Sequence, residues 1–199
     1  MVVEASPRGG EQNEARRLEI AEAAERCFER WGVQRTRMED VAREAGLARP
    51  VLYRYFANKR ALQTAVMVRH IDRRAGELHD AVPAVGPVAP LLLAALVSGI
   101  AEPPGDHVSE SVLGVDVIRE TAQLVAESEE IALAMHRYWQ PYLALALEAG
   151  ELREAVSIEA AERWLTRTVF TFLALPELTP PAQELEAILA TFVVAAVVS

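Results

Sequence analysis

Residues 36–59, TRMEDVAREAGLARPVLYRYFANK, constrain the fold of this 199-residue chain more than any other stretch. Apolar side chains at three- and four-residue spacing predict a short helix from about Met38 to Ala45. Thr36 and Glu39 have the spacing of a capping box at its start, and Gly46 can adopt the left-handed conformation that ends a helix. The stretch therefore begins with a helix that a tight turn follows directly.

A second short helix is predicted after that turn. It begins at Pro50, which suits a first helical turn because proline has no backbone N–H to leave unpaired. Leu52 and Phe56 lie four residues apart and face one way, so the arginines and tyrosines of the segment are left for the other faces. A helix with two apolar anchors and exposed arginines and tyrosines is suited to reading a DNA major groove.

The segment GLARPVLYRYFANKRAL, preceded by TRMEDVAREA, resembles the helix-turn-helix of the tetracycline-repressor (TetR) family of bacterial transcription regulators. The similarity covers roughly Arg17 to Leu62, and LYRYF followed by Lys59 is its most specific part. It implies an all-α fold: an N-terminal three-helix head with the helix-turn-helix, then a C-terminal helical bundle domain that dimerises. One departure is Ala48, where a capping serine or threonine is usual in the family; with Pro50 present, Arg49 becomes the expected cap.

Helical periodicity continues along the chain, with no strand pattern and no repeat. We expect a flexible tail over residues 1–10, a helix-turn-helix DNA-binding domain over 11–60, and a helical ligand-binding and dimerisation domain over 61–199. The further predicted helices span residues 11–31, 59–80, 91–101, 109–128, 129–149, 158–175 and 180–198. The first of them has its apolar residues on one stripe: Ile20, Ala24, Cys27, Phe28 and Trp31.

Three of these boundaries have recognisable end signals. Asn58 and Ser157 are plausible N-caps for the helices that follow them. Gly150 stops the helix before it. Pro141 lies inside that same helix, where it should produce a kink because it frees the carbonyl of Arg137.

The charge of the chain is unevenly distributed. The formal net charge is −9, but residues 31–60 hold seven basic and three acidic residues, which gives +4 there and −13 elsewhere. A basic DNA-reading domain on an acidic body has this pattern. A solvated, arginine-rich helix face would also have it, so the charge alone does not distinguish the two.

Roles in DNA binding follow from position in the predicted helices. Arg49 can reach guanine O6 and N7, and Val51 can pack on a thymine methyl. Arg54 and Tyr55 are candidates for further base or backbone contacts. The full candidate set is Thr36, Arg37, Arg49, Pro50, Val51, Tyr53, Arg54, Tyr55 and Lys59.

The resemblance implies phosphate contacts for three members of this set, Thr36, Tyr53 and Lys59, because matching positions commonly make them in the family. Arg37 can touch phosphate or base. For each arginine the alternative is a solvated surface charge, and for Tyr53 it is a ring packed in the core.

The predicted body carries many apolar and aromatic groups, some of them next to Pro141. They can line a ligand cavity, although core packing is the default interpretation. A ligand in such a cavity would be apolar or aromatic, with few charges to satisfy. The candidates are Met67, Ile71, Leu96, Leu113, Val117, Met135, Tyr138, Trp139 and Tyr142.

The last helix is apolar nearly all round, so something must cover both of its sides. A second copy of the chain is the simple answer, with two helices from each subunit forming a four-helix bundle. The resemblance implies the same homodimer. The candidate interface residues are Trp164, Thr168, Phe172, Leu185, Ile188, Leu189, Phe192 and Val193.

Several other classes of site are not supported by the sequence. The four histidines are scattered, so we expect no metal site, and we find no glycine-rich phosphate loop, no cofactor motif and no catalytic set. The single cysteine and the lack of a signal peptide or a bilayer-length apolar run favour a cytoplasmic protein with no membrane contact.

The function implied by the resemblance is that of a repressor. It would leave a palindromic operator on double-stranded DNA when a small apolar or aromatic effector binds. Two alternatives stay open. One is a regulator of the same fold that activates or responds to a protein partner. The other is an all-helical ligand-binding protein or enzyme with a vestigial DNA-binding head.

Overall fold

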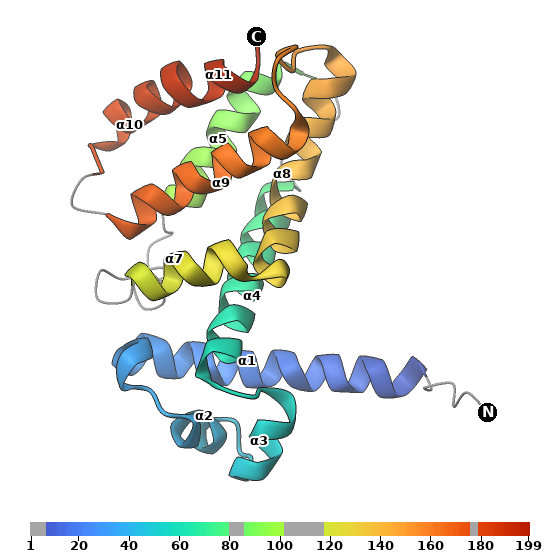
Figure 1. The fold of residues 1–199 in the computed structure, drawn as a ribbon, viewed down its shortest axis with the longest axis vertical. Helices are drawn as coiled ribbons and strands as arrows, with labels where there is room; N and C mark the ends of the chain where they lie inside the picture. The colour runs from blue at the N-terminus through green and yellow to red at the C-terminus, as the bar shows by residue number, and fades with distance from the viewer. Residues whose placement is uncertain (1–6, 80–85, 102–117, 176–178) are drawn as a thin grey trace. The chain divides into compact units, whose positions relative to one another are not determined.

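The computed structural model describes residues 7–79, 86–101, 118–175 and 179–199, and these residues form helices with no strand (Figure 1). The chain divides into an N-terminal unit up to Arg69 and a C-terminal unit from His70. The helices are α1 (Pro7–Arg35), α2 (Met38–Glu44), α3 (Arg49–Tyr55), α4 (Lys59–His79), α5 (Val88–Ile100), α7 (Ile118–Glu127), α8 (Glu129–Ala149), α9 (Ile158–Ala174), α10 (Ala182–Ile188), the π-helix η3 (Leu189–Val194) and α11 (Ala195–Val197).

The boundary between the two units falls inside α4. The sequence placed the end of the DNA-binding domain at residue 60, but the compact N-terminal unit extends to Arg69. The helix therefore contributes residues to both units. Arg69 belongs to the N-terminal unit through its guanidinium, which pairs with Glu22 at 2.9 Å and also with Glu25, both on α1.

The N-terminal unit is built around the apolar stripe of α1, and α2 packs against both α1 and α3 (Figure 1). Its buried side chains include Ile20, Ala24, Cys27, Phe28, Leu52, Phe56 and Leu62. The stripe was predicted correctly except at its end, because Trp31 is 39% exposed. The guanidinium of Arg30 lies over its ring, 5.2 Å from the centroid.

Cys27 lies on this stripe with no exposed surface. Burial, the largest cause, raises the pKa of its thiol to about 11. The side chain is therefore a protonated core group, as the sequence indicated.

Helix α1 is longer at both ends than expected. It begins at Pro7, inside the segment assigned to a flexible tail, and continues past Gly32 to Arg35. Gly32 nevertheless breaks the regular geometry, with φ 74° and ψ 159°. The helix end predicted at residue 31 is thus present as an interruption and not as a stop.

The caps of α2 and α3 differ from the expected ones by one residue. Arg37 is the N-cap of α2, and its backbone N–H donates to the carboxylate of Asp40 at 3.0 Å. Thr36 and Glu39 do not form the capping box, because the Thr36 side chain is buried. In α3, Arg49 is the first helical residue and not the cap, which is Ala48.

The turn and the start of α4 follow the sequence prediction. Gly46 has φ 65°, the left-handed conformation that favours glycine. Asn58 accepts a hydrogen bond from the backbone N–H of Ala61 at 2.9 Å, which confirms it as the cap of α4.

In the C-terminal unit, α5, α8 and α9 pack together, and α5 also packs against η3. The large buried side chains come mainly from α8, with Trp139, Tyr142 and Leu143 fully enclosed. The Tyr138 hydroxyl donates to the Ala95 carbonyl at 2.7 Å, and Trp139 Nε1 donates to Thr166 Oγ1 at 3.0 Å. Burial raises the pKa of Tyr138, so this hydroxyl remains a donor.

The ends of α8 and α9 are those expected. Ser128 accepts from the backbone N–H of Ile131, and Ser157 accepts from that of Ala160. Gly150 ends α8 with φ 69°. The helix expected over residues 109–128 is described only from Ile118, since residues 102–117 lie outside the described part.

The last helix is interrupted by a π-helical turn over Leu189–Val194. A π turn holds an extra residue, so sequence neighbours can share a side. Within this turn Val193 and Val194 are both buried, whereas Phe192 is 70% exposed. No helix in the described part of the chain is long and apolar enough to cross a membrane.

Candidate nucleic-acid interface and C-terminal cavity

Helix α3 presents most of the expected DNA-binding side chains on its surface. Arg49, Pro50, Tyr53 and Arg54 are exposed, whereas Leu52 is buried and anchors the helix. Val51 and Tyr55 are half-buried, and Arg37 is exposed at the start of α2. The structure thus brings a cluster of cationic and aromatic groups to one short helix and the cap beside it.

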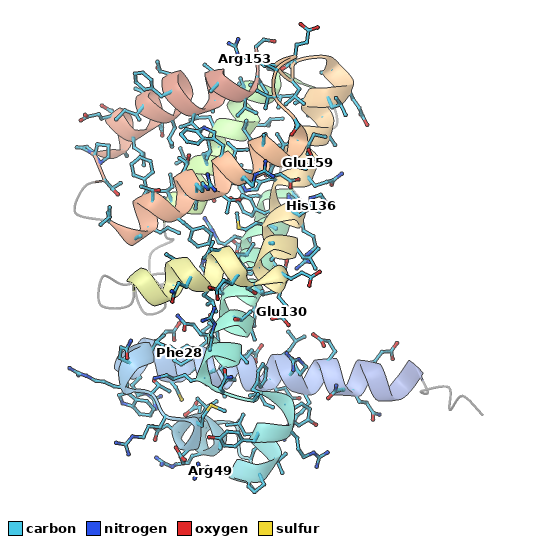
Figure 2. All side chains as sticks on the ribbon, viewed as in Figure 1. Phe28, Arg49, Glu130, His136, Arg153 and Glu159 are labelled. Atoms are coloured by element: carbon cyan, nitrogen blue, oxygen red, sulfur yellow. The ribbon has the colours of Figure 1, made fainter. Side chains whose placement is uncertain are left out.

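Arg49 projects from the first turn of α3 (Figure 2) and is held by two neighbours. Its Nη1 lies 3.0 Å from Oε1 of Glu39 on α2, and its guanidinium carbon lies 5.5 Å from the centre of the Tyr53 ring. The interaction with the Tyr53 side chain, and then the charge of Glu39, raises the pKa of Arg49. The guanidinium is therefore exposed and charged, but it has an acidic partner that DNA would have to displace.

Lys59 links the start of α4 to the end of α1. Its Nζ donates to the carbonyl of Val33 at 2.9 Å and to that of Gln34 at 3.2 Å. An ammonium group has three donors, so one remains for a phosphate. Lys59 thus has a structural role in addition to the expected one.

Thr36 does not have the exposed hydroxyl that the expected phosphate contact requires. Only 1% of the residue is exposed, and its Oγ1 lies 2.8 Å from the Gly32 carbonyl and 3.2 Å from that of Cys27. The hydroxyl is thus directed at backbone carbonyls of α1 and not at solvent. This candidate from the sequence is wrong in this structure.

Arg17 is a residue that the sequence reasoning did not identify. Its Nη1 donates to the Tyr55 carbonyl at 2.6 Å, and its guanidinium lies 4.4 Å from the centre of the Phe56 ring. It therefore fixes the C-terminal end of α3 against α1. The partners are 38 residues apart, so no local pattern could have identified the contact.

An ion pair also fixes α2 on α1. Arg26 Nε donates to Oε1 of Glu44 at 2.8 Å, and Arg30 lies 3.8 Å from the other carboxylate oxygen. The hydrogen bond from Arg26 is the largest cause that lowers the pKa of Glu44. These contacts hold the two helices that support α3.

The C-terminal unit contains a cavity of about 760 Å³ between α7, α8 and α9. Its apolar lining includes Val125, Ile131, Met135 and Phe170, and the side chains of His136, Glu162, Arg163 and Arg167 also line it. Charged side chains therefore stand beside apolar ones in the lining, and the expectation of a ligand with few charges stays a prediction. Figure 2 labels His136 on α8, whose Nδ1 lies 2.8 Å from Oε1 of Glu162 on α9.

The cavity does not lie where the sequence placed it. Of the nine candidates, Met135 alone lines it among the described residues. Leu96, Tyr138, Trp139 and Tyr142 are buried core residues, as are Met67 of the N-terminal unit and Ile71 of the C-terminal unit. Leu113 and Val117 lie outside the described residues.

The candidate dimer residues divide into two groups. Trp164 and Phe192 are exposed, and Phe172 and Ile188 are half-buried. Thr168, Leu185, Leu189 and Val193 are buried within a single chain. One side of the last helix is therefore covered by the chain itself, mainly by α5, and that part of the expected interface is wrong.

Residues 20–66 match the family model described as "Bacterial regulatory proteins, tetR family". The HTH-type transcriptional regulator TtgR of Pseudomonas putida is 38% identical over 89 residues, 42% of each chain. This match thus spans about two fifths of the relative's length. The probable HTH-type transcriptional regulator ArpR, also of Pseudomonas putida, is 27% identical over 158 residues, covering 76% of this chain and 75% of ArpR.

Two solved structures share the fold over most of the chain. The transcriptional regulator FadR from Bacillus subtilis, in complex with stearoyl-CoA, has a TM-score of 0.64 and 16% identity, covering 87% of this chain and 97% of FadR. GusR of Salmonella enterica has a TM-score of 0.60 and 22% identity, covering 90% of this chain and 95% of GusR. The likeness confirms the expected all-α fold, with an N-terminal helix-turn-helix and a C-terminal helical domain.

Proposed function

We propose that this chain, whose residues 20–66 match the tetR family of bacterial regulatory proteins, represses transcription by binding operator DNA. The observation that carries the proposal is α3, a two-turn helix with an anchored buried side and an exposed side of arginine and tyrosine. Such a helix can place its N-terminal residues against base edges in the major groove. In this proposal Arg49 reads bases, and Arg37, Tyr53, Arg54 and Lys59 hold the backbone.

Two substitutions test this assignment. Arg49→Ala should reduce the preference for the operator over shuffled DNA, because a good bidentate contact to guanine contributes about 1–3 kcal/mol of discrimination. Lys59→Ala should weaken binding to both DNAs alike. The measurement is a gel-shift or anisotropy titration with DNA from upstream of the protein's own gene. Operator preference that survives Arg49→Ala would exclude Arg49 as a base reader.

We propose that the regulator acts as a homodimer that uses the exposed side of α9 and of the last helix. Two large aromatic side chains support this surface, since Trp164 is 48% exposed and Phe192 is 70% exposed. A symmetric pair would place two copies of α3 on a palindromic operator, in grooves about 34–36 Å apart.

The dimer is tested by sedimentation of the full chain. Phe192→Asp should shift the mass to that of a monomer, because it buries a carboxylate in the proposed interface. The matched control is Leu133→Asp, which changes another exposed large apolar residue of the C-terminal unit. A wild-type chain that sediments as a monomer at micromolar concentration contradicts the proposal.

We further propose that a small molecule in the C-terminal cavity weakens DNA binding. The volume of about 760 Å³ suits a ligand of ordinary size. The complex of FadR with stearoyl-CoA supports effector binding within this fold. By linkage, operator DNA must weaken ligand binding by the same factor, which competition between the two ligands on the purified chain would measure.

A further inference from the structure

The cavity of the C-terminal unit has a side formed by two exposed arginines. Arg163 and Arg167 both line it, and their four-residue spacing on α9 places them on one side of the helix. Among the residues that the structure describes, neither guanidinium has a hydrogen bond or an ion pair. Glu159, one turn before Arg163, acts on it by charge but does not line the cavity.

Glu162 is the one acidic residue among the described residues that line the cavity, and it already has a partner. The Glu162 carboxylate lies 2.8 Å from His136 Nδ1, and its side chain is 17% exposed. It is therefore held by its partner on the neighbouring helix α8. The part of the lining that the structure describes thus has two permanent positive charges and one partnered negative charge.

The remaining wall is largely apolar. Ile131 and Met135 of α8 are buried, and Phe170 of α9 and Val125 of α7 are half-buried. Arg163, Arg167 and Phe170 recur at three- and four-residue spacing, so the positive groups lie next to this wall and not opposite it. A ligand here meets an apolar surface that ends in two guanidinium groups.

We propose that this cavity binds an amphipathic anion, with its apolar body against Phe170, Met135 and Ile131 and its single acidic group at Arg163 and Arg167. The proposal rests on the proposed function for its regulatory meaning, and it names the chemical class of the effector. Both arginines are also exposed to solvent. A cationic ligand would be repelled, and a neutral one would gain no charge-assisted hydrogen bond from the two guanidinium groups. A carboxylate accepts hydrogen bonds from guanidinium groups in a charge-assisted geometry.

The test compares three ligands that share a ten-carbon chain: decanoate, 1-decanol and decylammonium. Each is titrated into the full chain by calorimetry, without DNA. Decanoate should bind about tenfold more tightly than 1-decanol, and decylammonium should bind more weakly than either. Equal binding of the three, a preference for decylammonium, or no decanoate binding up to about 1 mM would overturn the proposal.

Substitutions of the two arginines test where the carboxylate of decanoate binds. Arg163→Gln together with Arg167→Gln should reduce decanoate affinity to that of 1-decanol and leave 1-decanol binding unchanged. Arg153→Gln is the control, since Arg153 is exposed in the same unit and does not line the cavity. A double variant that keeps the decanoate preference would exclude these arginines. The comparison of the three ligands on the unmodified chain stands even if the double variant does not fold.

The experiments distinguish a failure of the proposed ligand class from a failure of the proposed DNA-binding function. If decanoate is preferred but the chain binds no operator, the ligand class is right and the regulatory role fails. If the chain binds its operator but shows no preference for decanoate, the ligand class alone is wrong.

Discussion

At the scale of single residues, Glu39 competes with DNA for the side chain of Arg49. Arg49 Nη1 lies 3.0 Å from Glu39 Oε1, on the same surface that would face phosphates. Both side chains are solvated, so the pair contributes little to stability. Its main effect would be on DNA, because binding must break the pair and bring a carboxylate near the backbone.

Replacing Glu39 by glutamine should therefore tighten operator binding, by about three- to tenfold at low salt. The gain should be measured by anisotropy titration on operator DNA. The control Glu130→Gln removes one negative charge from an exposed site on α8, in the C-terminal unit. Weaker binding by Glu39→Gln would show that the carboxylate positions Arg49 and does not compete for it.

The local signals of the sequence were sufficient for several single residues. Asn58 and Ser157 cap the N-termini of helices through residues three positions away, and Gly46 and Gly150 follow helix C-termini with positive φ. Contacts between distant residues could not be predicted in this way. The hydrogen bond from Arg17 to the Tyr55 carbonyl, for example, joins residues that are 38 apart in the sequence.

At the scale of elements, α2 is attached to α1 through the ionised carboxylate of Glu44. The pKa of Glu44 is lowered from 4.5 in the folded state by its hydrogen bond with Arg26. A lowered carboxylate pKa stabilises the folded state above the ordinary value, and this contribution is lost as the pH falls through the folded pKa. The N-terminal unit should therefore loosen in mild acid, below pH 4.5.

The prediction is checked by thermal unfolding at a series of pH values from neutral to acid. Glu44→Gln should lower the midpoint at neutral pH and flatten its decline below pH 4.5. Glu14→Gln, at an exposed site on α1, should leave the profile unchanged. If the Glu44 variant retains the full acid decline, other carboxylates cause it.

Two glycines in helices should respond in opposite directions to alanine. A Cβ at Gly99 of α5 would lie 3.3 Å from both the Tyr138 hydroxyl and Val169, whereas a Cβ at Gly76 of α4 would meet nothing within 4 Å. Gly99→Ala should therefore destabilise the fold by about 1 kcal/mol through overpacking. Gly76→Ala should stabilise it by about 0.5–1 kcal/mol through helix propensity.

Urea unfolding of the two variants gives the comparison. A stabilising Gly99→Ala would show that α5 can move away from α8 and α9 at little cost. The helical nature of α5 was predictable from composition, but this close approach was not. It depends on which residues of three elements meet at Gly99.

At the scale of the whole molecule, the charge distribution has two opposite effects on DNA binding. The residues from 31 to 60 carry +4, and the rest of the chain carries −13. The positive part attracts DNA, and the negative remainder repels it and limits non-specific binding. Both interactions are screened by salt, but phosphate neutralisation also releases counterions.

Operator affinity should accordingly fall by about 10³-fold or more between about 50 and 200 mM salt. A titration series at four salt concentrations measures the slope, and Arg54→Gln should reduce its magnitude by about one per subunit. A slope near zero would place the contact away from the basic residues of α2 and α3. The fold and this charge asymmetry followed from the sequence, whereas the cavity did not, since three separate helices assemble its lining.

Because Cys27 is buried, its reaction with a thiol reagent can report the opening of the N-terminal unit. It is the only thiol of the chain, and alkylation requires an exposed thiolate. Iodoacetamide should thus modify Cys27 only when the N-terminal unit opens, and the labelling rate then measures the free energy of that opening. Gly99→Ala, which acts in the C-terminal unit, should leave the rate unchanged if the two units open independently, and bound operator DNA should slow it.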